Sequence, residues 1–101
     1  MKTMRKLYDY TIDELNDVIK YAKCSMQYVS TDPELARMYY NLAKGEMDDA
    51  KNLHDASKRL SSAKLKTENV DPRLMELWEE MEERKIDLMG KAKAYLDNAR
   101  M

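Results

Sequence analysis

Two carboxylates and the single histidine on one predicted helix are the residues best suited to chemistry in this chain. Glu46 and Asp49 lie three residues apart, at positions where the helical repeat is otherwise apolar, and burying a carboxylate without a partner is costly. Two inward carboxylates would bind an Fe, Mn or Zn ion together with ligands from another helix. At about 100° per residue, His54 points away from both, so all three would meet only between two subunits.

The same residues also allow interpretations without a metal. The carboxylates would bond to side chains of other helices, lie in a wide and hydrated part of the bundle, or turn outward if the helix rotates. The candidate bonding partners are Tyr21, Tyr39 and Lys85, and the residues that a rotation would bury are Ala43, Ala50 and Leu53. For His54, the alternative is a partly exposed position at the edge of the packed face.

The composition predicts that helices position these residues. The 101 residues include two Gly and two Pro, and Val, Ile and Thr are sparse. A sheet and a nucleotide-binding fold with Gly-rich loops are therefore excluded. We expect an all-α, single-domain chain, an antiparallel bundle of three long helices at about 11–29, 33–62 and 72–99.

Start signals and apolar repeats define these helices. Thr11 to Glu14 fits a capping box, and the other two helices begin at Asp32-Pro33 and Asp71-Pro72. Each helix carries an apolar repeat with alternating spacings of four and three residues, typical of a helix that packs along its neighbour. In the second helix the expected seam is Leu35, Tyr39, Leu42, Glu46, Asp49, Leu53, Ala56 and Leu60.

Charge and cysteine content exclude several function classes. The net charge is −1 and no segment forms a basic stripe, so we expect no nucleic-acid partner. No run approaches the roughly 20 apolar residues of a membrane span, so no membrane partner is expected. The lone Cys24 excludes an internal disulfide and a cysteine zinc site, and favours a reducing, cytoplasmic location. No catalytic constellation is present, so the chain is not expected to be an enzyme.

The predicted core is thin for a chain of this length, which favours burial of more apolar surface between copies. We therefore expect a homodimer or higher homo-oligomer that acts through protein contacts. The third helix also carries an acidic row that is typical of a solvated face and, alternatively, would dock a protein partner. The row consists of Glu76, Glu80, Glu83 and Asp87.

Residues 34–54 resemble the metal-binding helix of ferritin-like, rubrerythrin-type proteins. Glu46 falls on the Glu of their Glu-x-x-His motif and Asp49 on its His, and the likeness covers about residues 10–60. It implies a ferritin-like half-bundle completed by dimerisation, with an inter-subunit metal site. The first helix offers no inward Glu, because Glu14 is assigned to the cap, and the third helix matches nothing in the family. Small phage- or prophage-encoded bacterial proteins look similar.

Overall fold

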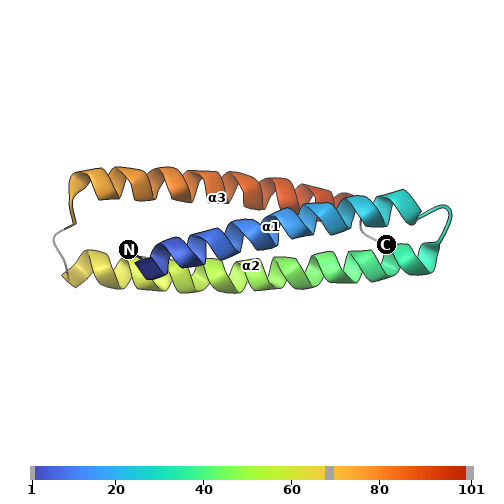
Figure 1. Cartoon of the computed structure of the whole chain (residues 1–101), viewed down its shortest axis with the longest axis horizontal. Coiled ribbons are helices and arrows are strands. Elements are labelled where there is room, and N and C mark those ends of the chain that lie inside the picture. The colour runs from blue at the N-terminus through green and yellow to red at the C-terminus, as the bar shows by residue number, and fades with distance from the viewer. Residues whose placement is uncertain (1, 68–69, 100–101) are drawn as a thin grey trace.

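The chain forms a rod of three long helices. The computed structural model describes residues 2–67 and 70–99, and no strand occurs among them. The helices are α1 (Lys2–Tyr28), α2 (Pro33–Thr67) and α3 (Pro72–Asn98). They lie lengthwise in a shape of 56 × 18 × 17 Å, with α2 running opposite to α1 and α3 (Figure 1). The expected all-α bundle of three helices is thus confirmed.

The starts of α2 and α3 follow the sequence signals. Asp32 Oδ1 accepts a hydrogen bond from the backbone N–H of Leu35 at 3.1 Å. Asp71 Oδ1 accepts one from Arg73 N–H at 2.9 Å. These side chains satisfy backbone donors that have no partner within the helix. α2 continues beyond the expected residue 62 and ends at Thr67.

The expected start of α1 is wrong. α1 begins nine residues earlier, at Lys2, so Thr11 lies inside the helix and caps nothing. Its Oγ1 donates a hydrogen bond to the carbonyl of Leu7 at 2.7 Å, one turn back along the helix. Glu14 is therefore not used by a cap.

The buried face of α2 differs from the expected seam by one residue, or about 100° of rotation. The fully or almost fully buried residues of α2 are Ala36, Ala43, Met47, Ala50 and Ser57. Small side chains on this face allow α1 to approach closely, and Ser25 Oγ of α1 donates a buried hydrogen bond to the carbonyl of Ala36 at 2.8 Å. The rotation considered from the sequence thus occurs for Ala43 and Ala50, whereas Leu53 is only half-buried.

The core lies along α1, between the other two helices. α1 packs closely on α2 and less extensively on α3, while α2 and α3 barely touch each other. The buried residues of α3 are Met81, Lys85 and Ala92. The core cluster is formed by Leu15, Val18, Ile19, Ala22, Ala43, Met47, Ala50, Ala92 and Ala99.

Within the described residues, none of the helices has an apolar stretch long enough to cross a membrane.

Candidate functional site

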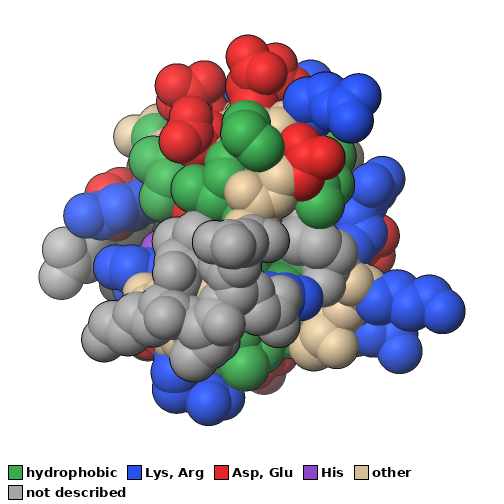
Figure 2. Space-filling view, turned by 90° about the vertical axis from the view of Figure 1, so that its left-hand side faces the viewer, with side chains coloured by type: hydrophobic (Ala, Val, Ile, Leu, Met, Phe, Trp, Pro, Cys, Tyr) green, Lys and Arg blue, Asp and Glu red, His purple; other side chains and the backbone are tan. Residues whose placement is uncertain are grey.

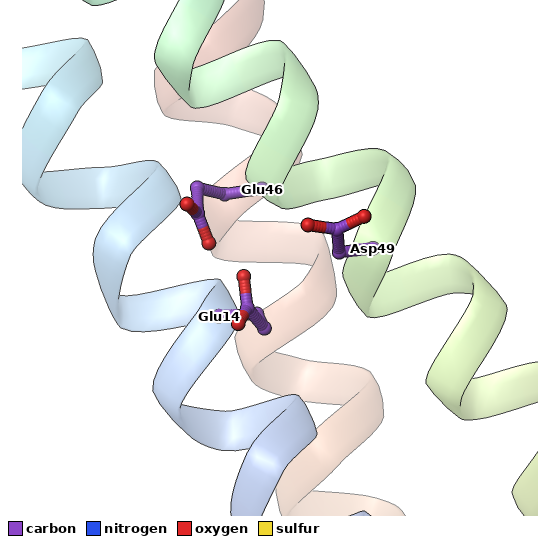
Figure 3. A group of neighbouring side chains, drawn as sticks. All are labelled: Glu14, Glu46 and Asp49. Atoms are coloured by element: carbon purple, nitrogen blue, oxygen red, sulfur yellow. The ribbon is translucent and has the colours of Figure 1, made fainter.

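Three carboxylates converge between α1 and α2. Glu14 of α1 points toward Glu46 and Asp49 of α2, and one oxygen from each lies within 4.8 Å of the others (Figure 3). The structure therefore brings together the two carboxylates singled out in the sequence and adds a third. Glu14 was missed because a capping role was assigned to it, and only the true start of α1 makes it available.

The carboxylate cluster brings negative charges together without a bonded positive charge in the described part of the chain. Glu14 Oε2 is buried and has no hydrogen-bond partner, Glu46 is half-buried and Asp49 is exposed. None of the ion pairs found among the described residues includes them. Lys85, one of the partners considered from the sequence, instead bonds to Glu82 at 2.6 Å. Like charges this close repel one another unless a cation or a proton is added.

The carboxylate cluster lies beside an open, shallow depression. Tyr10, Asn52 and Leu53 line it together with two members of the cluster, Glu14 and Asp49. Further along the same side, the ring of Tyr39 stacks on those of Tyr21 and Tyr28, with centroids 6.1 and 6.0 Å apart. Aromatic side chains from both helices therefore continue the surface beyond the acidic centre.

A second apolar stripe on α2 remains outside the core. At about 100° per residue its four leucines lie within about 20° of one another, one residue away from the buried face. Leu42 is 42% exposed, and the other three are half-buried. We call Leu35, Leu42, Leu53 and Leu60 the leucine stripe.

His54 of α2 is half-buried and is not part of the carboxylate cluster. Burial and the nearby Lys85 ammonium lower the pKa of His54 from its ordinary value of 6.5, and Glu82 partly opposes this effect. His54 Nδ1 and Ser57 Oγ are buried and have no hydrogen-bond partner.

The acidic row of α3 is solvent-exposed, as its periodicity predicts. All four of its carboxylates are exposed. Figure 2 views the rod from its left-hand end, where Asp and Glu side chains gather over α3 at the top and most Lys and Arg side chains lie at the sides and below. Charge is therefore segregated at this end of the molecule.

Compared with known proteins, the chain matches no family model, no curated protein and no solved structure.

Proposed function

We propose that this chain is a non-enzymatic, cytoplasmic helical-bundle protein that acts through protein contacts and associates with a second copy of itself along the leucine stripe. The observation that carries the proposal is the distribution of side chains on α2. Alanine and serine occupy the face packed within the chain, while leucine, which gains more from burial, occupies the neighbouring face. A second copy would cover the leucines that the chain's own helices leave partly exposed. These leucines lie on both sides of Glu46 and Asp49, which occupy the same face between Leu42 and Leu53.

The dimensions of the surface suit a dimer. The leucine stripe spans residues 35–60, which is about 38 Å along a helix. A strip of that length on a rod 18 Å wide presents on the order of 700 Å², near the ~800 Å² that each partner buries in a standard interface. The exposed Met38 and Tyr10 would add apolar surface at its edges.

The Leu42→Glu variant is expected to weaken self-association at least tenfold, because a carboxylate would be buried at the interface. Sedimentation velocity over a range of chain concentrations measures the effect. The matched control is Ile86→Glu, on α3, where the native side chain is 51% exposed. The control should leave the association constant unchanged. A native chain that stays monomeric at the highest concentration contradicts the proposal.

The carboxylate cluster favours a second candidate function, the binding of a divalent cation. Glu14 Oε2 is buried without a partner, and it lies in a group of three carboxylates that approach within 4.8 Å. Oxygen ligands of this kind suit Mn²⁺ better than Zn²⁺, which prefers nitrogen and sulfur. The inward carboxylate of α1 also supports the ferritin-like interpretation, since that resemblance requires a ligand from the first helix. Phage origin remains a proposal that rests on the resemblance alone.

Mn²⁺ at 100 times its dissociation constant is expected to stabilise the chain by about 2.7 kcal/mol if this cluster binds it. Thermal melts with Mn²⁺, Fe²⁺ or Zn²⁺ measure the shift, and Glu46→Ala should abolish it. Glu80→Ala, which removes an exposed carboxylate of the acidic row, is the control and should leave the shift intact. Equal melting temperatures with and without each metal would rule out this second function.

A further inference from the structure

The leucine stripe and the two carboxylates of α2 are arranged symmetrically about one point of the helix. The midpoint between the outer leucines, Leu35 and Leu60, lies between residues 47 and 48, and the two inner leucines have the same midpoint. Glu46 and Asp49 are centred there as well. All six side chains lie within about 60° of one another around the helix. The order of leucines and carboxylates along this face is therefore the same in both directions of α2.

The two ends of the leucine stripe carry charges of opposite sign. Asp32 and Glu34 lie where α2 begins, and both are exposed. At the other end, Arg59 is exposed and Lys64 is half-buried. A parallel pair of α2 helices would bring like charges together at each end of the stripe. An antiparallel pair instead places the acidic end of one copy beside the basic end of the other, and such complementary charges fix the orientation of an interface.

The position of α1 also favours an antiparallel pair. α1 packs on the buried alanine face of α2, which lies about 100° around the helix from the leucine stripe. A two-fold axis that lies in the interface and crosses α2 at right angles keeps the α1 helices of both copies on the same side. Because α1 and α2 run in opposite directions (Figure 1), all neighbours in the resulting group of four helices are antiparallel, as in many four-helix bundles.

We propose that two copies of the chain pair antiparallel along the leucine stripe, about a two-fold axis that passes between residues 47 and 48 of α2. This inference rests on the self-association proposed above and specifies its orientation and register. Leu35 of one copy then faces Leu60 of the other, and the two inner leucines pair in the same way. The carboxylate clusters of the two copies meet at the axis.

The meeting of the two carboxylate clusters opposes association at the centre of the interface. Within one copy, oxygens of Glu14, Glu46 and Asp49 already lie within 4.8 Å of one another (Figure 3). Asp49 is exposed and Glu46 is half-buried, so a partner can bring its own carboxylates against them. Like charges at such short range repel one another. Removal of one negative charge from each copy is therefore expected to tighten the dimer.

Spin labels test the orientation. In a Cys24→Ser background, a single label is attached through Asp48→Cys, near the axis, or through Thr31→Cys, at the end of the stripe; both native side chains are exposed. Electron paramagnetic resonance should give a short distance between the Asp48 labels and a separation of about 50 Å along the rod between the Thr31 labels. Similar distances at both positions in a chain that sediments as a dimer would overturn the antiparallel register alone. A chain that stays monomeric would overturn the self-association with it.

The Glu46→Gln variant tests whether the carboxylate clusters meet. Its dimer should be tighter than the native dimer by roughly fivefold, the scale of one pair of unit charges about 4 Å apart in water. Sedimentation velocity measures the association constant, in a buffer with a chelator so that no divalent cation neutralises the native carboxylates. Glu80→Gln, which changes an exposed carboxylate of α3, is the matched control and should leave association unchanged. Unchanged or weaker association of Glu46→Gln would place the clusters outside the interface and overturn the proposal.

Discussion

The Glu82→Gln variant is expected to lose about 3 kcal/mol of unfolding free energy at neutral pH, the scale measured when one member of a buried ion pair is removed. The physical reason is Lys85, whose side chain is fully buried and whose bond to Glu82 is 2.6 Å long. Without the carboxylate, the ammonium remains in the interior with no negative partner. Urea denaturation followed by circular dichroism measures the loss.

The Lys85→Met variant serves as its matched control. It removes the buried charge together with the need for a partner, and a side chain of similar length fills the same space. Glu82 then loses its partner, but its side chain is 27% exposed and stays partly hydrated, whereas an unpaired Lys85 ammonium would be fully buried. We therefore expect Lys85→Met to lose less unfolding free energy than Glu82→Gln. If both variants lose the same amount, the penalty comes from packing rather than from charge.

The Leu15→Ala variant is expected to cost about 3 kcal/mol, because Leu15 is fully buried in the core cluster and its removal leaves a cavity. In a domain of this size, that corresponds to a fall in melting temperature of about 12–24 °C. Leu42→Ala, which removes the same atoms from the leucine stripe, should change the stability of the monomer by less than about 0.5 kcal/mol.

This pair of leucines must be compared at concentrations where the chain is monomeric. Differential scanning calorimetry at several chain concentrations provides the control, since a melting temperature that varies with concentration reveals association. If Leu42→Ala costs the monomer as much as Leu15→Ala, the leucine stripe belongs to the core and α2 is rotated relative to the structure described above.

The sequence predicted the helices well because their start signals are local. Asp32 and Asp71 each accept a hydrogen bond from a backbone N–H two or three residues later. An Asp followed directly by Pro is typical of a helix start. The start of α1 could not be found in this way, since Thr11 and Glu14 match a capping box and also suit a helix interior. The repeat of four- and three-residue spacings also holds in α3, where Met81, Lys85 and Ala92 are buried in one row.

The rotation of α2 was harder to predict, because two stripes one residue apart share the same repeat. Hydrophobicity favours burial of the leucines, whereas close packing of α1 on α2 favours burial of the alanines. Which of the two stripes is buried depends on the tertiary contact between the helices. The carboxylate cluster depends on the same decision. Glu46 and Asp49 were recognised from the sequence, while Glu14 required both the true start of α1 and its orientation toward α2.

Because the rod is only 17–18 Å thick, every interior residue lies close to water. The free energy of local unfolding is therefore expected to vary along the rod. The apolar core cluster protects the end where α1 turns into α2 and where α3 finishes. Outside this cluster, Met4 of α1 and Met81 of α3 are also buried, and the side chain of Lys85 is fully buried. We therefore expect the helix segments that contact the cluster to open last in hydrogen exchange, and the segments beyond it to open first.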